Sequence, residues 1–418
     1  MSLAWQIRSW GMNCCLMVTA CCLLLLGGCA SQQTGGRASV SPTFVVPKTN
    51  GSVVLSGNEL AALQSTGQLD RHIPNETMAD VTSQYAYFLR QGRNSMRTFS
   101  KRAERYLAYS RKVFHDRGMP EELAYLAIVE SGYRPDAKSP VGAAGAWQFM
   151  PFTGERFDLS QDWWTDERLD PYEATEAAAT YLQKLYATFG DWPTAIAAYN
   201  AGEGKIGKAM QETGSSNYYE VKARNNQLDE KIRLREETKQ YVPRFLAVSK
   251  IMRNLPQLGF DAISPDETQS VVRFTAKPGT DLQGLAHACR MDWEHFSELN
   301  RHHKRRITHN ARETYVYVPE GRAREAKDFL NSPTSTVYAG WTPCTIASNA
   351  ESWDKISHRC RVPVAQLRAI NPDVTRLRVG DVVLLPHTSA LALNNTMSVD
   401  RATVSAARNS RPREQGLM

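Results

Sequence analysis

The chain has 418 residues, 42% of them hydrophobic, so it can bury a sizeable core and is long enough for more than one domain. Its 50 Lys and Arg residues against 43 Asp and Glu residues give a formal net charge of +7, which suits an anionic partner. It contains neither a Cys-x-x-Cys nor a His-Glu-x-x-His pattern, so we expect no metal and no cofactor.

The N-terminal segment has the pattern of a targeting sequence, and residues 1–28 are predicted to be a signal peptide. Arg8 precedes an apolar run from Met12 to Leu26, which is too short to predict a spanning helix. Small residues then precede Cys29, similar to the lipobox of bacterial lipoproteins, although an ordinary signal peptide with an incidental cysteine is the alternative. With Ala30 in place of Asp, the resemblance implies a lipid anchor in the outer membrane of a Gram-negative bacterium. The mature chain would then lie in the periplasm, where nucleic acid is not expected as a partner.

Composition divides the remainder of the chain. Residues 29–75 are rich in Ser, Thr, Gly and Gln and are predicted to form a flexible linker. Residues 388–418 are polar and basic and are predicted to be disordered. Between them, residues 76–262 have mostly helical periodicity, beginning with helices expected over Asp80–Gln91 and Ser100–Arg117.

The next expected helix, Glu121–Glu130, places an acid on an apolar face. Three residues share that face with Glu130 at helical spacing: Leu123, Leu126 and Ala127. Burial there would raise the pKa of the carboxyl group, as a general acid requires. Gly132 then ends the helix, so Glu130 is expected at a helix end that opens to a cleft. The alternative is that Glu130 caps the helix or pairs with Arg134.

A loop with paired glycines, Gly142–Pro151, follows the acid and delivers an aromatic ring and an amide, Trp147 and Gln148. Amide donors and flexible backbone beside an acid are what cleavage of a glycosidic bond needs. Further along, Trp163 and Trp164 fit either a sugar subsite or core packing.

After about residue 265 the chain changes to two copies of one unit, because residues 285–300 align without a gap with residues 356–371. Each copy lies between two predicted strands: Val271–Thr275 and Thr314–Val318 in the first, Thr336–Tyr338 and Val382–Leu385 in the second. The order strand–helix–helix–strand predicts two small α+β modules, residues 270–320 and 336–387.

Three cysteines remain after the lipidation site, and an exported chain meets an oxidising compartment. Cys289 and Cys360 occupy equivalent positions in the two copies, where a small apolar residue suits packing. Only the second copy has an additional cysteine, Cys344. We therefore expect a disulfide between Cys344 and Cys360 and a buried thiol at Cys289.

Four ordered motifs resemble those of the membrane-bound, type D lytic transglycosylases, whose SLT domain is lysozyme-like: Glu130-Ser131, Gly145-Ala-Trp-Gln148, Ala198-Tyr199-Asn200 and Glu237-Thr-Lys-Gln-Tyr241-Val-Pro. The resemblance implies a mainly helical, lysozyme-like domain over residues 76–262. The two repeats resemble LysM modules, which bind the N-acetylglucosamine-containing glycan of cell walls. The second repeat matches better, through Leu377-Arg-Val-Gly-Asp381. The first departs at Asn300–Asn310, a basic insert in which His302 and His303 are expected to be solvated.

The resemblance also assigns roles, with peptidoglycan glycan strands as the partner. Glu130 would be the single general acid and base, and Ser131 its hydrogen-bonding neighbour. Gln148 would lie in the substrate cleft, Tyr199 and Asn200 would face the N-acetyl group and the acid, and Tyr241 would orient Glu130. The implied reaction cleaves the bond from N-acetylmuramic acid to N-acetylglucosamine and leaves a 1,6-anhydro end.

Two other functions stay open from the sequence. One is hydrolysis by water, as in a goose-type lysozyme, and the other is a non-catalytic wall anchor in which only the repeats act. A chain cut after about residue 265 should keep catalysis on small soluble muropeptides but act more weakly on intact sacculi, because weak binding units in series raise the local concentration at the wall. The basic segment Arg301–Arg306 would add an attraction to the anionic wall that salt screens.

Overall fold

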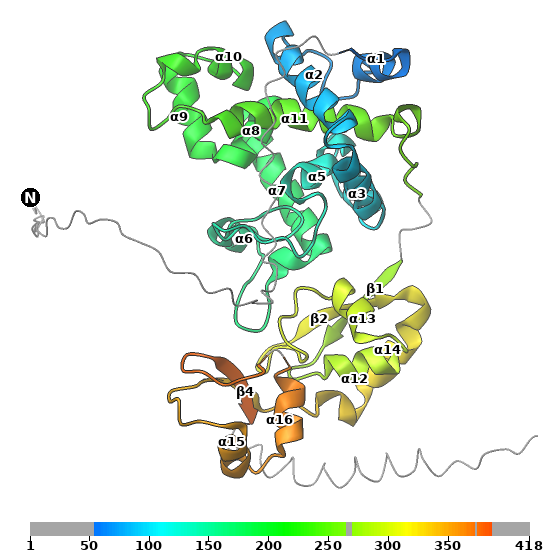
Figure 1. Cartoon of the computed structure of the whole chain (residues 1–418), viewed down its shortest axis with the longest axis vertical. Coiled ribbons are helices and arrows are strands. Elements are labelled where there is room, and N and C mark those ends of the chain that lie inside the picture. The colour runs from blue at the N-terminus through cyan, green and yellow to red at the C-terminus, as the bar shows by residue number, and fades with distance from the viewer. Residues whose placement is uncertain (1–53, 265–269, 373, 387–418) are drawn as a thin grey trace, which may run out of the picture. The chain divides into compact units, whose positions relative to one another are not determined.

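The computed structural model describes residues 54–264, 270–372 and 374–386 (Figure 1). The predicted signal peptide, the lipidation site Cys29 and the C-terminal tail lie outside these residues. Within the described part of the chain, the search for a helix long and apolar enough to span a bilayer found none.

The first part of the described chain is helical. Its α-helices are α1 (Gly57–Gln64), α2 (Asn75–Leu89), α3 (Arg93–Glu104), α4 (Leu107–Asp116), α5 (Leu126–Ser131), α6 (Pro151–Arg156), α7 (Pro171–Phe189), α8 (Trp192–Ala201), α9 (Glu203–Thr213), α10 (Tyr218–Ala223) and α11 (Glu236–Arg253). Short 3₁₀ segments connect them: η1 (Glu121–Tyr125), η2 (Glu167–Leu169), η3 (Asn225–Gln227) and η4 (Pro256–Leu258).

Local sequence signals set the limits of the long helix α7. The side chain of Asp170 accepts hydrogen bonds from the backbone N–H groups of Tyr172 and Glu173, and Pro171 fits the first turn because its missing N–H is not needed there. Gly190 ends the helix in the left-handed conformation, at φ 69°. The alanines of α7 and of the following helix α8 then allow these two helices to pack closely.

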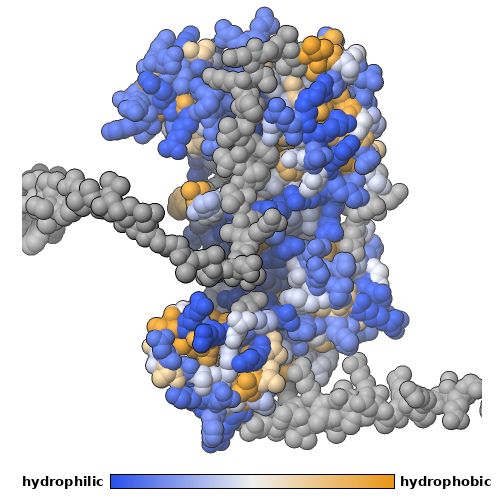
Figure 2. Space-filling model, viewed as in Figure 1, coloured by the Kyte–Doolittle hydropathy of each residue, from blue (hydrophilic) through white to orange (hydrophobic). Residues whose placement is uncertain are grey.

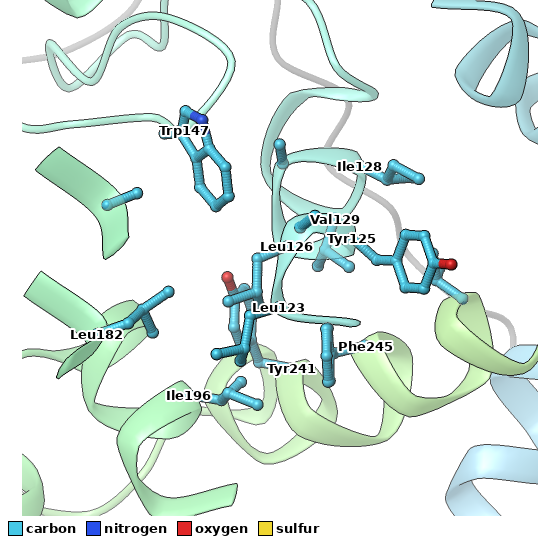
Figure 3. Packing of buried hydrophobic residues seen from close by; sticks show 14 of the residues in the cluster. Leu123, Tyr125, Leu126, Ile128, Val129, Trp147, Leu182, Ile196, Tyr241 and Phe245 are labelled. Atoms are coloured by element: carbon cyan, nitrogen blue, oxygen red, sulfur yellow. The ribbon is translucent and has the colours of Figure 1, made fainter. Parts of the chain in front are cut away.

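Helix α11 lies at the centre of the helical part and packs against α2, α5 and α8. Figure 3 shows Tyr241 and Phe245 of α11 beside Leu123 of η1 and Leu126 of α5. These four side chains are almost fully buried, and truncating one such as Phe245 to Ala would cost about 3–5 kcal/mol. The helix that carries the predicted acid is therefore fixed by the core.

Three predicted segments of the helical part need correction. Residues 57–64 of the predicted linker form α1, because Ser56 and Glu59 make a reciprocal capping box and Ala62 and Leu63 are buried. The single helix expected over Ser100–Arg117 is two helices, α3 and α4. The chain breaks at Tyr106, whose buried ring stacks on that of Tyr133 at 6.4 Å. The first half of Glu121–Glu130 is the 3₁₀ segment η1 rather than α-helix.

The second part consists of two βααβ units. In the first, β1 (Val271–Ala276) pairs antiparallel with β2 (Thr314–Pro319), with Val271 opposite Pro319, and α12 (Leu282–Ala288) and α13 (Trp293–Leu299) lie between them in sequence. A 3₁₀ turn, η6 (Glu320–Arg322), and helix α14 (Ala323–Asn331) follow. In the second unit, β3 (Trp341–Thr345) pairs antiparallel with β4 (Val382–Pro386) around α15 (Trp353–Cys360) and α16 (Val364–Ile370). The predicted fold class, a mainly helical domain followed by two small α+β modules, is confirmed.

One predicted strand is wrong. The segment Thr336–Tyr338 is not extended: the 3₁₀ helix η7 (Pro333–Thr336), capped by Ser332, reaches into it. Gly340, at φ 91°, then turns the chain, and the strand begins at Trp341, whose ring is fully buried. The buried tryptophan, rather than the β-branched residues before it, sets the start of the strand.

The predicted disulfide is not formed in the structure, where Cys289, Cys344 and Cys360 are free thiols. Cys344 lies on β3 opposite Val383, and Cys360 ends α15. Burial raises the pKa of the Cys360 thiol, and the neighbouring Cys344 adds to this shift. The expected burial of Cys289 is found, at 0% exposure.

The apolar side chains are largely inside the molecule. The face in Figure 2 is mostly hydrophilic, with apolar residues in small separate groups. Among the described residues, the large apolar side chains that are strongly exposed include Val141 and Phe152, at 75% and 77%, on either side of the loop Gly142–Pro151.

Candidate active site

Glu130 lies in the last turn of α5, where the chain makes a tight left-handed turn. Gly132 has φ 63°, and its N–H and that of Tyr133 close the helix onto the carbonyls of Ile128 and Ala127. A Cβ atom at Gly132 would lie 2.4 Å from the ring of Phe99, so only glycine fits. This turn leaves Glu130 at the end of the helix with its side chain partly exposed, as the sequence predicted.

The surroundings of Glu130 are those of a protonatable acid. Burial raises the pKa of its carboxyl group to about 7, and the negative charge of Glu237 acts in the same direction. The hydroxyl of Tyr241 donates a hydrogen bond to Oε1 of Glu130, and this bond and the charge of Arg244 act in the opposite direction. Tyr241 itself has a pKa well above its usual value because of burial, so it remains a neutral donor.

The loop Gly142–Pro151 lies against the end of α5. The hydroxyl of Ser131 donates to the carbonyl of Ala146 at 2.8 Å and accepts from the N–H of Arg134 at 2.9 Å. Ser131 thus joins the loop to α5. It was predicted to hydrogen-bond to Glu130, and that bond is not among its contacts in the structure. The alternative in which Glu130 pairs with Arg134 is not found, because Arg134 lies beside Asp136 at 3.6 Å.

The amide of Gln148 supports the loop from within. Its Nε2 donates to the carbonyl of Gly145 at 2.7 Å, and its backbone has φ 50°, which is uncommon for a residue with a side chain. Trp147, by contrast, is fully buried, and its Nε1 donates to Thr175 at 2.9 Å. The aromatic ring of the loop is therefore an anchor in the core (Figure 3) rather than a sugar-binding surface.

Tyr199 and Asn200, at the end of α8, contact the loop Gly142–Pro151 and α11, respectively. The hydroxyl of Tyr199 donates to the carbonyl of Trp147 at 2.9 Å. Burial raises the pKa of Tyr199, and the negative charge of Glu130 adds to this shift. Asn200 is engaged with α11, where its Oδ1 accepts from the hydroxyl of Thr238 at 3.1 Å. The structure thus gathers Glu130, Tyr199 and Tyr241 at one place, with Asn200 beside them.

A buried arginine that the sequence analysis did not identify, Arg168, hydrogen-bonds to the loop Gly142–Pro151. Arg168 makes two bonds of 2.9 Å to the carboxylate of Asp166, and its Nη1 donates to the carbonyls of Gly142 at 2.8 Å and Phe149 at 3.0 Å. Its own backbone carbonyl lies so close to Gly145 that a Cβ there would be 1.7 Å away. An Asp-x-Arg pair is common in loops, so its spacing alone carries no signal for this role.

The two tryptophans before this arginine are packed rather than open. Trp164 is 4% exposed and belongs to the same buried cluster as Ile307, and Trp163 is covered by the guanidinium of Arg305 at 3.9 Å. Of the two alternatives for these residues, core packing is therefore what the structure shows. In the described part of the chain, no cluster of three or more His, Cys, Asp or Glu side chains suited to a metal ion is found.

Family comparisons agree with this geometry. Residues 112–222, which include Glu130, Gln148, Tyr199 and Asn200, match the transglycosylase SLT domain. Residues 271–335 match the LysM-like domain of the lytic transglycosylase MltD. The resemblance predicted from the sequence is thus confirmed: one region of the chain is similar to an SLT domain, and a later region is similar to the LysM-like domain of MltD.

Individual relatives extend the same likeness. The membrane-bound lytic murein transglycosylase D of Escherichia coli K12 is 34% identical over 249 residues, which cover 58% of this chain and 53% of that protein. The soluble lytic murein transglycosylase of the same strain is 37% identical over 86 residues, or 19% of this chain and 13% of that one. The chain therefore spans about half the length of the first of these relatives.

Proposed function

We propose that this protein is a lytic transglycosylase that cleaves the β-1,4 bond from N-acetylmuramic acid to N-acetylglucosamine in peptidoglycan. The observation that carries the proposal is the state of Glu130: a partly buried carboxyl group whose pKa is raised to about 7 and whose Oε1 accepts from Tyr241. Such a group is protonated in a large fraction of molecules at neutral pH and can donate that proton to a leaving oxygen. The SLT domain match supports the same reaction class.

The reaction is written with Glu130 as the only acid and base. Its proton passes to the glycosidic oxygen as the bond from that oxygen to C1 of the muramic acid breaks. The 6-hydroxyl of the same sugar then forms a bond to C1 and returns its proton to the Glu130 carboxylate. The products are a free 4-hydroxyl on N-acetylglucosamine and a 1,6-anhydro end, no water is consumed, and Glu130 regains its starting state.

The neighbouring residues have distinct tasks in this proposal. Tyr241 keeps the carboxyl group in place and stabilises it as a carboxylate between the two proton transfers. Tyr199 and Asn200 hold the N-acetyl group of the muramic acid, which assists at C1. Gln148 and Ser131 keep the segment Gly142–Phe149 of the loop Gly142–Pro151, here called the cleft loop, in shape through their bonds to Gly145 and Ala146.

Hydrolysis by water is the competing reaction, and it would need a second carboxylate near Glu130. Inverting glycosidases need a second carboxylate about 6.5–9.5 Å from the acid, to activate water. Glu237 is exposed and acts on Glu130 through its charge, so it is the residue to test for that role. In the proposed reaction Glu237 only raises the pKa of Glu130, and its replacement by Gln leaves the anhydro product unchanged.

The proposal includes the place of action. Catalysis is assigned to residues 76–262, wall binding to residues 336–387, and anchorage to a lipid on Cys29, which would hold the enzyme at the outer membrane within the periplasm of a Gram-negative bacterium. The comparison with a membrane-bound relative supports this location.

The deciding experiment is mass spectrometry of the soluble products from purified murein. Products with 1,6-anhydro ends support the transglycosylase, and reducing ends, which are one water heavier, indicate hydrolysis. Binding to sacculi without any cleavage, by a correctly folded protein, would leave only a wall anchor.

A further inference from the structure

The basic insert of the first LysM-like module lies against the catalytic domain. The N–H of Asp166 donates to the carbonyl of His302 at 2.8 Å, and the N–H of Lys304 donates to the carbonyl of Trp164, also at 2.8 Å. Thr165 and His303 form an antiparallel bridge between these two bonds. Residues 160–169, here called the docking loop, thus pair with the insert as one short strand pairs with another.

Side chains close this contact. His302, expected to be solvated, is 0% exposed; its ring stacks on Tyr315 at 4.7 Å, and its Nδ1 lies 3.6 Å from Oδ2 of the helix-capping Asp170. Tyr317 packs on Tyr172 of α7 at 4.9 Å between ring centroids. Burial lowers the pKa of His302 to about 4, so it is a neutral packing residue at neutral pH. The prediction that the two histidines are solvated is wrong for His302, which strand β2 and the start of α7 cover. His303 is partly buried, and its Nε2 lies 2.9 Å from the carbonyl of Tyr315.

The insert is also tied to its own module. The N–H of Thr308 donates to the carbonyl of Thr280 at 3.0 Å, and Ile307 bridges to Asp281. The loop that follows β1 is therefore joined to the basic insert that follows α13. The insert is in turn joined to the docking loop.

From the docking loop a short series of contacts leads to the loop that contains Gln148. Asp166, whose backbone N–H holds the insert, uses its carboxylate to hold Arg168. Arg168 in turn donates to the carbonyls of Gly142 and Phe149, at the two ends of the cleft loop that contains Gln148. Asp166, Arg168 and Phe149 are buried, which makes the contacts among them hard to replace by water, whereas Gly142 lies at the surface.

We propose that the first LysM-like module is a fixed brace of the catalytic domain, and that its docking, through Asp166 and the positioning residue Arg168, holds the cleft loop Gly142–Phe149 in its active shape. The partner of the basic insert is the chain's own SLT domain, and the second module keeps the wall-binding role. The part of this inference that concerns reaction rate rests on the proposed function, whereas the brace itself does not.

This proposal reverses the expectation for a chain cut after about residue 265. Such a cut removes Leu299, Tyr315 and Tyr317, which belong to the same buried cluster as the core of the helical domain. It also uncovers the buried carboxylate of Asp170. The shortened chain is therefore expected to lose activity on soluble fragments as well as on sacculi, and point variants of the full chain are the sharper test.

The first experiment compares two tryptophans in the full chain. Trp164→Ala removes a buried ring of the docking loop, and Trp192→Ala removes a partly buried ring that stacks on Tyr186, away from the contact. Amide hydrogen exchange by mass spectrometry is followed over residues 142–149. We expect faster exchange there in Trp164→Ala and not in Trp192→Ala. Unchanged exchange of residues 142–149 in a folded Trp164→Ala protein would overturn the brace, whatever the activity of the enzyme.

If Trp164→Ala fails to fold, Arg312→Ala takes its place. The exposed guanidinium of Arg312 donates to Asp162 of the docking loop at 2.9 Å, so its loss loosens the same contact more gently. The same increase in exchange at residues 142–149, smaller in size, is then expected, and its absence again overturns the proposal.

The second experiment asks whether docking acts through Arg168. Cleavage of soluble muropeptides is measured for Trp164→Ala, Arg168→Lys and the double variant. Lysine keeps the charge, but its single nitrogen has three N–H donors and cannot reproduce the four bonds of Arg168, two to Asp166 and two to carbonyls. We expect each single change to lower kcat by roughly tenfold or more with little change in KM, because a small misplacement of catalytic groups is enough for this. The double variant should be no slower than the slower single variant. Multiplying effects would show that the two residues act independently and would overturn the positioning role.

Discussion

Replacing Glu130 with Gln should abolish cleavage and at the same time stabilise the folded protein at alkaline pH. The amide has nearly the same shape and can still accept the hydrogen bond from Tyr241 that Oε1 of Glu130 accepts. It cannot donate a carboxylic proton, and loss of a general acid typically costs ~10²–10⁴-fold in rate. Turnover within about tenfold of the parent would remove Glu130 from its role.

The effect on stability follows from the pKa of Glu130, which rises from 4.5 to about 7 on folding. Because the folded state holds the proton more tightly, the stability contributed by this group is complete below pH 4.5 and is lost as the pH rises through about 7. A difference of about 2.5 pKa units corresponds to about 3 kcal/mol, and the partial exposure of the side chain reduces it, so we expect about 1–3 kcal/mol. Glutamine does not ionise and avoids this cost.

Thermal unfolding of the parent and of Glu130→Gln between pH 5 and 9 measures this difference. We expect similar midpoints at pH 5 and a midpoint several degrees higher for the variant at pH 8.5. Glu155→Gln makes the same chemical change at an exposed carboxyl group and is the matched control, with no expected change in either rate or midpoint. A variant with the same pH dependence of stability as the parent would show that Glu130 is not held in a desolvated site.

Three further predictions concern the same site. The kcat/KM of the parent should fall as the pH rises through about 7, since Glu130 must begin protonated; a rate that is flat up to pH 9 would contradict this. Tyr241→Phe removes a bond that lowers the pKa of Glu130, so the alkaline limb should move to higher pH while the maximum rate falls roughly tenfold or more. An unshifted limb would leave Tyr241 as packing alone. Gly145→Ala should abolish activity and lower the unfolding midpoint, because its Cβ would lie 1.7 Å from the Arg168 carbonyl. Gly142→Ala is the control, since Gly142 also has a positive φ but its Cβ would have its nearest neighbours at 3.9 Å; it should lower the free energy of unfolding by no more than about 1–3 kcal/mol. Equal effects of the two changes would mean that the arginine does not press on the loop.

Local patterns in the sequence were sufficient for much of the fold. Helical spacing placed Glu130 on an apolar face, and Gly132 marked the end of its helix; both depend only on residues a few positions apart. The alignment of residues 285–300 with residues 356–371 predicted two βααβ units, because a repeat implies that the same local preferences act twice.

The same local reasoning failed where a distant contact overrode it. Tyr106 interrupts a helical pattern because its ring packs on Tyr133, and the strand expected at Thr336–Tyr338 gives way to one that begins at the buried Trp341. The spacing of residues along the chain does not show that Tyr106 packs on Tyr133 or that Trp341 is buried. Both facts depend on how the folded chain packs.

By itself, then, the sequence was sufficient to predict the acid, its motif neighbours and the order of the domains, because these predictions depend on short segments. Only the tertiary structure decided the pKa of Glu130, since desolvation depends on what α11 and the cleft loop place around it. Only the tertiary structure showed that the basic insert around His302 is buried against Asp170 and that Arg168 joins this contact to the cleft loop. A histidine in a charged run has the same local sequence whether it faces water or a carboxylate more than a hundred residues away, so the fold alone distinguishes the two.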